Sequence, residues 1–258
     1  MPTQLSNVEI PVGEQRIEGT FLTASPFVPG VLLVHGWDGS QAQYIARAHE
    51  LAALGCVCLT IDLRGHARHR AHRMAVTRED NLQDVLAALD TLRSHPGVDT
   101  QSIAVVGSSY GGYLAAIASA LRPVRWLALR APAIYRDEDW AMPKGMLDRA
   151  DLGAYRQTPI AYESNRALRA CAEFHGDVLV VESETDRTVP HQVIQSYVGA
   201  FRHVRSLTYR VLSGTDHALS TDEMRQAYGL QLVSWMTEML LGAKAAAGSI
   251  RPVPHAPA

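Results

Sequence analysis

Ser109 is the residue whose type and setting most clearly predict chemistry. It is the middle residue of the segment GSSYG at 107–111, which has the pattern G-x-S-x-G. An apolar segment, SIAVVGS, precedes it and a segment of small residues, YGGYLAAIASAL, follows it, as a sharp strand-to-helix turn requires. Such a turn exposes its central hydroxyl, so we interpret Ser109 as a nucleophile. Its neighbour Ser108 is then a small residue tolerated beside the turn.

A serine hydroxyl needs a base, and the base in turn needs a carboxylate that fixes its tautomer. Of the eleven histidines, His217 directly follows the apolar segment LTYRVL, and Asp186 follows the apolar segment VLVVES. Both therefore come just after a predicted strand, as Ser109 does. The chain order Ser, Asp, His is the order that accompanies a G-x-S-x-G turn. The sequence therefore predicts a catalytic triad of Ser109, Asp186 and His217.

Three other carboxylates compete with Asp186 for the acid position. Glu182 lies within the predicted strand, and Glu184 comes two residues too early. Asp216 is adjacent to the histidine and is too close in sequence to point at its ring. Asp186 is the prediction that remains.

The elements that position these residues form an alternating pattern. The first thirty residues predict two strands, SNVEIPV and QRIEGTFLT, around a turn at Gly13. From residue 31 onward, apolar strands alternate with helices, which are predicted to begin near Ser40 and Thr77. Apolar strands bounded by helices are typical of a parallel sheet covered on both faces, where ligands bind at the carboxyl ends of the strands. The predicted class is α/β.

Five motifs in chain order make the sequence similar to the α/β-hydrolases. They are HGW at 35–37, DLRGH at 62–66, GSSYGG at 107–112, TDRTVP at 185–190 and TDH at 215–217. The resemblance covers about residues 6–241 and extends to the dienelactone-hydrolase-like esterases with small caps. It implies an α/β-hydrolase fold, with a mostly parallel central sheet, helices on both faces and a short cap insertion. No metal and no organic cofactor is implied.

The resemblance also assigns an oxyanion hole, formed by the backbone N–H groups of Trp37 and Tyr110. It implies that His35 organises the oxyanion loop rather than transferring protons. The implied organisation is one domain over residues 1–241, with a cap at about 132–176. In the cap, Tyr135, Trp140 and Met142 are candidate substrate contacts, although they could instead only anchor the insertion. Residues 242–258, rich in Ala, Gly and Pro, are predicted to be a disordered tail.

The loop at 64–73 departs from the family. Ala67 stands where the family has a glycine, and four arginines alternate with three histidines in the segment RGHARHRAHR. A metal site formed by the histidines lacks a nearby carboxylate or cysteine. Two interpretations stay open: a solvated basic loop, or a loop that receives a carboxylate or phosphate of the substrate through Arg68 and Arg70. Asp62 and Arg64 are expected to pair and brace this loop.

Composition limits the possible partners. The net charge of −2 gives no electrostatic case for nucleic acid or an anionic membrane. Three cysteines, two of them alternating in a predicted strand, fit reduced thiols in a core. The chain starts without the pattern of a signal peptide and contains no apolar run long enough to span a membrane, so we expect a cytoplasmic protein. The sequence carries no indication of the oligomeric state.

These observations predict a serine hydrolase whose substrate is a small-molecule ester. A carboxylesterase acting on small acyl or aryl esters is the leading interpretation. A peptidase, a thioesterase or a C–C bond hydrolase uses the same triad, and these alternatives stay open. A binding protein that keeps the fold without turnover is the remaining class. Serine at position 109, in place of aspartate, argues against dehalogenase or epoxide hydrolase chemistry.

Overall fold

A single eight-stranded sheet forms the centre of the protein. The computed structural model describes residues 4–23 and 28–248. The strand order is β1-β2-β4-β3-β5-β6-β7-β8; β1, β2 and β4 pair antiparallel and all other neighbours pair parallel. The strands are β1 (Gln4–Val12), β2 (Gln15–Thr23), β3 (Val28–Val34), β4 (Val57–Ile61), β5 (Val98–Ser108), β6 (Trp126–Arg130), β7 (Asp177–Ser183) and β8 (Ser206–Leu212).

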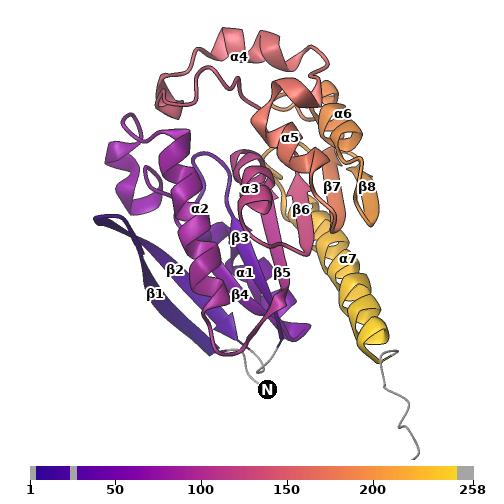
Figure 1. Ribbon diagram of the computed structural model, residues 1–258. Coiled ribbons are helices and arrows are strands. Elements are labelled where there is room, and N and C mark those ends of the chain that lie inside the picture. Colours follow the sequence, from indigo (N-terminus) through magenta and orange to yellow (C-terminus); the bar gives the residue numbers. More distant parts are fainter. Residues whose placement is uncertain (1–3, 24–27, 249–258) are drawn as a thin grey trace, which may run out of the picture.

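Helices cover both faces of this sheet (Figure 1). Helices α1 and α7 pack on one face, and α2, α3, α5 and α6 pack on the other. The α-helices are α1 (Ile45–Ala53), α2 (Arg78–Arg93), α3 (Tyr110–Leu121), α4 (Arg149–Arg156), α5 (Arg166–Ala172), α6 (His191–Ala200) and α7 (Asp222–Gly248). Short 3₁₀ turns are η1 (Gln41–Tyr44), η2 (Ala67–His72), η3 (Lys144–Met146) and η4 (Tyr162–Ser164). The predicted α/β-hydrolase fold is confirmed.

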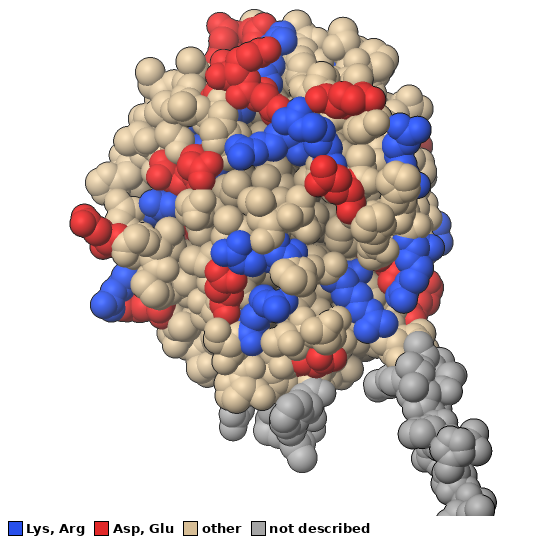
Figure 2. Space-filling view, in the orientation of Figure 1, with Lys and Arg blue, Asp and Glu red and all other residues tan. Residues whose placement is uncertain are grey.

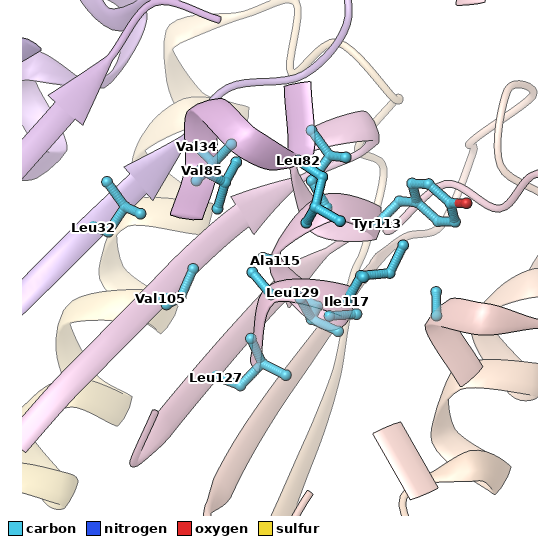
Figure 3. Packing of buried hydrophobic residues seen from close by; sticks show 14 of the residues in the cluster. Leu32, Val34, Leu82, Val85, Val105, Tyr113, Ala115, Ile117, Leu127 and Leu129 are labelled. Atoms are coloured by element: carbon cyan, nitrogen blue, oxygen red, sulfur yellow. The ribbon is translucent and has the colours of Figure 1, made fainter. Parts of the chain in front are cut away.

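Each central strand supplies side chains to two separate cores, because successive residues of a strand point to opposite faces. In β3, Leu32 and Val34 belong to the core beneath α2 and α3, whereas Val31 and Leu33 belong to the core beneath α1 and α7. Figure 3 shows the first of these cores, where side chains of β3, β5 and β6 meet those of α2 and α3. This two-sided burial explains why the strands are continuous apolar runs in the sequence.

Local signals in the sequence set the helix starts. Thr77 caps α2: its hydroxyl accepts from the Asp80 N–H at 3.1 Å, and the Asp80 carboxylate accepts from the Thr77 N–H at 2.9 Å. This reciprocal arrangement satisfies two N–H groups that the first helical turn leaves free. The helix predicted from Ser40 onward is divided, because its first turn is the 3₁₀ turn η1 and the α-helix begins only at Ile45.

The insertion between β6 and β7 has two parts. The first part carries η3, α4 and η4, and α4 lies across the carboxyl edge of the sheet at the top of Figure 1. In the second part, Leu168 and Cys171 of α5 are fully buried in the core beneath α3 and α6. Within the range 132–176, which remains our prediction for the cap, α5 is therefore part of the helical layer of the domain.

The C-terminal helix corrects one expectation. Helix α7 continues to Gly248, so residues 242–248 are helical and are not part of a disordered tail. Its apolar residues Leu232 and Met236 are fully buried against the sheet, which is what holds the helix in place. Residues 249–258 lie outside the part that the structure describes.

The surface carries charges of both signs. On the face seen in Figure 2, basic and acidic side chains are interspersed and neither sign fills a continuous area. No helix formed by residues 4–23 and 28–248 combines the length and apolar character needed to cross a bilayer.

Candidate active site

Ser109 lies at the turn between β5 and α3. Its backbone has φ 51° and ψ −115°, a combination that non-glycine residues rarely adopt. Contacts with the chain after β5 hold this conformation: the Ser109 N–H donates to the Arg130 carbonyl at 2.8 Å, and the Ala133 N–H donates to the Ser109 carbonyl at 3.0 Å. The predicted nucleophile elbow is therefore present in its expected geometry.

Two glycines make room for this turn. A Cβ atom on Gly107 would lie 2.5 Å from the Gly111 carbonyl oxygen. A Cβ atom on Gly111 would lie 2.3 Å from the Val34 carbonyl oxygen and 2.4 Å from that of His35. The contacted atoms are backbone atoms of α3 for Gly107, and of β3 and the residue after it for Gly111, so they cannot move aside without displacing the helix or the strand.

We expect Gly111→Ala to destabilise the protein by about 4 kcal/mol or more, because the new methyl group overlaps two backbone carbonyls. Urea unfolding measures this change. Gly153→Ala is the matched control, because Gly153 lies inside α4 with no atom within 4 Å of its would-be Cβ. That substitution should be neutral or stabilising by up to about 1 kcal/mol. Equal unfolding midpoints for the wild type and Gly111→Ala would contradict the prediction.

A continuous chain of hydrogen bonds connects Ser109 to a carboxylate. The His217 Nε2 lies 2.9 Å from the Ser109 Oγ, and the His217 Nδ1 lies 2.6 Å from an Asp186 carboxylate oxygen. With Nε2 accepting from the serine hydroxyl, Nδ1 carries the proton and donates it to Asp186. The Asp186 side chain is 3% exposed and the His217 side chain 22% exposed. The structure thus brings the three residues of the predicted triad together.

The loops that carry Asp186 and His217 are fastened to each other and to the sheet. The second Asp186 oxygen accepts from the N–H groups of Thr188 and Val189 at 2.8 and 2.9 Å. The backbone and hydroxyl of Thr185 both donate to the Thr215 carbonyl at 2.9 Å. These bonds fix the carboxylate relative to the histidine loop.

Arg130, whose role the sequence did not indicate, holds the backbone of the His217 loop. It ends β6, and its guanidinium donates to the His217 carbonyl at 2.5 Å and to the Ser183 hydroxyl at 3.2 Å. The same residue accepts the Ser109 N–H through its own carbonyl. One residue therefore connects the serine turn with the histidine loop.

The competing carboxylates have other partners. Glu182 accepts from Tyr209 and lies 2.8 Å from the His191 ring nitrogen. Glu184 accepts from the Gly214 N–H at 2.7 Å. Asp216 accepts from Ser220. None of these contacts involves the His217 ring.

The two predicted oxyanion donors lie on either side of the serine turn. Tyr110 is the first residue of α3, and the first N–H groups of a helix have no acceptor within it. In the described part of the chain, the Trp37 N–H has no backbone acceptor either.

His35 is fully buried; its Nε2 accepts from the Leu63 N–H at 3.1 Å, and its Nδ1 lies 2.7 Å from the Gly36 carbonyl oxygen. Burial lowers the pKa of His35, so it braces the loop as a neutral ring.

Asp62 and Arg64 brace the neighbouring loops, but not through each other. Asp62 accepts from the backbone and side-chain amides of Gln41 at 2.7 and 3.0 Å. The Arg64 guanidinium pairs with the buried Asp84 at 2.6 Å. The expected Asp62–Arg64 pair is therefore wrong. Arg64 instead pairs with Asp84 of α2, a residue distant in sequence, and closeness along the chain could not indicate this contact.

The basic loop has an exposed outer part and a packed inner part. Arg68 pairs with Glu18, and Arg70 lies 3.8 Å from Asp38; both arginine side chains are more than half exposed. On the inner side, the buried His66 ring meets the Trp37 ring edge-on at 4.6 Å, and burial lowers the pKa of His66 to about 4. These pairs favour the solvated-loop interpretation for Arg68 and Arg70.

The three candidate substrate contacts differ in their surroundings. Tyr135 is 2% exposed and meets the Tyr110 ring edge-on at 5.8 Å. Trp140 donates its indole N–H to Glu79 at 2.8 Å, which anchors the cap on α2. Met142 is 43% exposed. A substrate role for these residues remains a prediction.

Lys144 is a residue near the site that the sequence analysis missed. Its ammonium nitrogen lies 3.7 Å from the centroid of the Trp37 ring. Burial lowers the pKa of Lys144 to about 7. One signal could have pointed to it, since Lys144 and Lys244 are the only lysines among the 24 basic residues of the sequence.

No group of three or more His, Cys, Asp or Glu side chains suited to a metal ion is found within residues 4–23 and 28–248. The three cysteines are buried, and burial raises the pKa of Cys58 and Cys171.

Comparison with known proteins identifies relatives of the sequence and of the fold. Esterase LipC of Mycobacterium tuberculosis is 40% identical over 95 residues, a match that covers 36% of this chain and 21% of that protein. The crystal structure of a dienelactone hydrolase from Anabaena variabilis has a TM-score of 0.67 at 20% identity, covering 92% of this chain and 98% of that one. An acylaminoacyl peptidase from Pyrococcus horikoshii has a TM-score of 0.67 at 14% identity, covering 92% of this chain but 41% of that one.

The sequence profile of the prolyl oligopeptidase family matches residues 42–243, well over half of the chain and the part that carries Ser109, Asp186 and His217. Together with the fold, this match places the chain in the α/β-hydrolase superfamily. The chain belongs to the prolyl oligopeptidase family.

Proposed function

We propose that the chain is a carboxylesterase that cleaves small acyl or aryl esters through an acyl-enzyme on Ser109. The observation that carries the proposal is the hydrogen-bond chain from Ser109 through His217 to Asp186. His217 Nε2 takes the hydroxyl proton while the Ser109 oxygen attacks the ester carbonyl. The protonated imidazole, stabilised by Asp186, then donates that proton to the departing alkoxide. Water activated by the same histidine releases the acid and restores the serine.

The negative charge that develops on the carbonyl oxygen needs fixed donors. We assign this role to the backbone N–H groups of Trp37 and Tyr110, with the positive end of α3 adding to their effect. One such donor contributes about 2.7–4 kcal/mol to transition-state stabilisation.

The test is hydrolysis of p-nitrophenyl esters from acetyl to dodecanoyl. We expect activity that is highest for the short acyl groups, because Trp140 and Lys144 hold the cap close to the body of the domain. Activity that rises steadily toward dodecanoyl would contradict the small-substrate proposal. Absence of ester turnover in a protein that is labelled at Ser109 by a fluorophosphonate would contradict the esterase proposal while keeping a serine hydrolase.

A peptidase is the second candidate, because the family profile and the acylaminoacyl peptidase structure both favour it. Matched pairs of substrates separate the two. An acyl p-nitrophenyl ester and the corresponding p-nitroanilide differ only in the bond that is broken. An esterase cleaves the ester alone at a useful rate, whereas a peptidase cleaves both. A binding protein of the same fold is separated from both by the lack of fluorophosphonate labelling.

A further inference from the structure

Lys144 lies beside three aromatic rings near the serine turn. Its ammonium nitrogen is 3.7 Å from the Trp37 ring centroid, 5.3 Å from that of Tyr110 and 5.5 Å from that of Tyr135. The first two rings belong to the residues whose N–H groups form the proposed oxyanion hole. The cation is therefore part of the wall next to the proposed reacting carbonyl.

The backbone around Lys144 is fixed to the body of the domain. Pro143 forms an antiparallel bridge with Thr77, and the Lys144 N–H donates to the Val76 carbonyl at 3.3 Å. A Cβ atom on Gly145 would lie only 2.7 Å from the Met74 sulfur, so η3 packs closely on the segment that precedes α2. These contacts fix the point from which the Lys144 side chain extends, and the ring contacts describe where its ammonium lies.

No carboxylate within ion-pair distance neutralises Lys144 among the residues that the structure describes. The acid with the largest effect on it, Asp38, pairs with Arg73 at 2.9 Å and with Arg70 at 3.8 Å. Burial lowers the pKa of the Lys144 ammonium most, and the charge of Arg156 lowers it further; Asp38 opposes them, and Arg73 and Arg149 add smaller lowering effects.

Two more cations lie beside the Tyr135 ring, and neither forms an ion pair with an acid among the described residues. The guanidinium carbons of Arg156 and Arg78 lie 5.1 and 5.4 Å from the Tyr135 ring centroid. Arg156 donates to the carbonyls of Ile134 and Thr188, and the fully buried Arg78 donates to one carbonyl while two of its nitrogens meet no partner in the described part of the chain. Buried positive charge without a negative partner is costly. An anion brought in by a ligand would reduce that cost.

We propose that Lys144 binds a carboxylate that the substrate carries beside its scissile ester, so that the preferred substrates are anionic esters. This inference rests on the proposed esterase function. The ammonium donates a charge-assisted hydrogen bond to the carboxylate. The positive charges of Arg156 and Arg78, which lie next to the Tyr135 ring, also attract this carboxylate. Arg68 and Arg70, already paired at the outer surface, do not take part.

The experiment compares esters that differ in one terminal group, a carboxylate or a neutral group, on either side of the scissile bond. On the acyl side the pair is mono-p-nitrophenyl adipate and p-nitrophenyl hexanoate, and on the alcohol side para-acetoxybenzoate and para-acetoxybenzamide. We expect KM to be about tenfold lower for the anionic member of at least one pair, since a hydrogen bond to a charged group contributes on this scale. Lys144→Met should remove this difference by raising KM for the anionic ester about tenfold relative to KM for its neutral partner. Lys144→Arg should restore part of it.

The pH dependence gives a second readout. A lysine with its pKa lowered to about 7 is charged below that pH, so KM for the anionic ester should rise between about pH 6 and 9 in the wild type and stay level in Lys144→Met. Burial lowers the pKa of His66 to about 4 and raises that of Tyr110 and Tyr135, which keeps these rings neutral across this range. The other charged groups around Lys144 are Asp38, Arg73, Arg149 and Arg156.

A matched control removes another cation of the cap. Arg136 pairs with Asp151 at the surface, so Arg136→Gln should leave the charge preference unchanged. Benzoate should also slow fluorophosphonate labelling of the wild type but not of Lys144→Met, a readout that needs no ester turnover. Equal KM values within both wild-type pairs, or equal protection by benzoate of both proteins, would overturn the inference. If none of the four esters is hydrolysed, while the fluorophosphonate still labels the protein and benzoate still slows that labelling through Lys144, only the esterase proposal would be overturned.

Discussion

Replacing Ser109 with alanine is expected to lower kcat for ester hydrolysis by about 10⁶-fold, the scale seen when a triad nucleophile is removed. The acyl-enzyme can no longer form, and His217 is left without the hydroxyl that it deprotonates. Residual hydrolysis above the rate in water would come from the oxyanion donors and from substrate binding. Initial rates with p-nitrophenyl butyrate measure the loss, and urea unfolding shows whether the variant is folded.

The adjacent serine provides the control for this substitution. Ser108 is 3% exposed, and its hydroxyl has no hydrogen-bond partner among the described residues. Ser108→Ala should therefore keep kcat within about twofold, because surroundings that make no bond to a group lose little when it is removed. A large loss in Ser108→Ala with activity retained in Ser109→Ala would refute the assignment of the nucleophile.

Asp186→Asn is expected to lower kcat by about 10⁴-fold while leaving the fold intact. The asparagine oxygen can still accept from the Thr188 and Val189 N–H groups, which keeps the loop in place. Its amide nitrogen then faces the His217 Nδ1 and turns that atom into an acceptor. The ring proton moves to Nε2, where it blocks transfer from the Ser109 hydroxyl. Steady-state kinetics of the purified variant measure the effect.

Glu184→Gln is the matched control for the acid. Glu184 lies two residues before Asp186 and accepts from the Gly214 N–H at an exposed position. The glutamine oxygen keeps that bond, so we expect kcat to change by less than about twofold. Were Glu184→Gln to cost as much as Asp186→Asn, the position of the acid would have to be reassigned.

That Ser109, Asp186 and His217 lie together could be predicted from the sequence, because each residue follows a strand that is buried between two helical layers. A strand that is buried on both faces must consist of apolar residues throughout, so it is visible in the sequence as an apolar run. Because the strands are parallel, the carboxyl ends of these runs lie at the same edge of the sheet. Ser109, Asp186 and His217 are each the chemically suited residue just beyond such a run. Glycine at 107 and 111 marks the turn, because no other residue fits against the strand backbone.

Long-range pairing of charges could not be predicted in this way. Arg64 pairs with Asp84 of α2, twenty residues away, although the nearer Asp62 was expected. Lys144 was missed for the same reason, since its importance depends on the rings of Trp37 and Tyr135, which only the folded chain brings beside it. The end of α7 was misplaced because composition indicated disorder at 242–248, whereas the helix continues from its packed part.

The separation of the triad residues along the chain has a consequence for synthesis. His217 follows Ser109 by 108 residues and Asp186 by 31, and a chain emerges from the ribosome with its N-terminal part first. The contacts described for the serine turn come from strands β3, β5 and β6, helix α3 and Ala133, all of which precede residue 134. A nascent chain can therefore hold a formed elbow while the base is still to be translated. Reactivity of the serine begins only when the β8 segment and its histidine have emerged and docked.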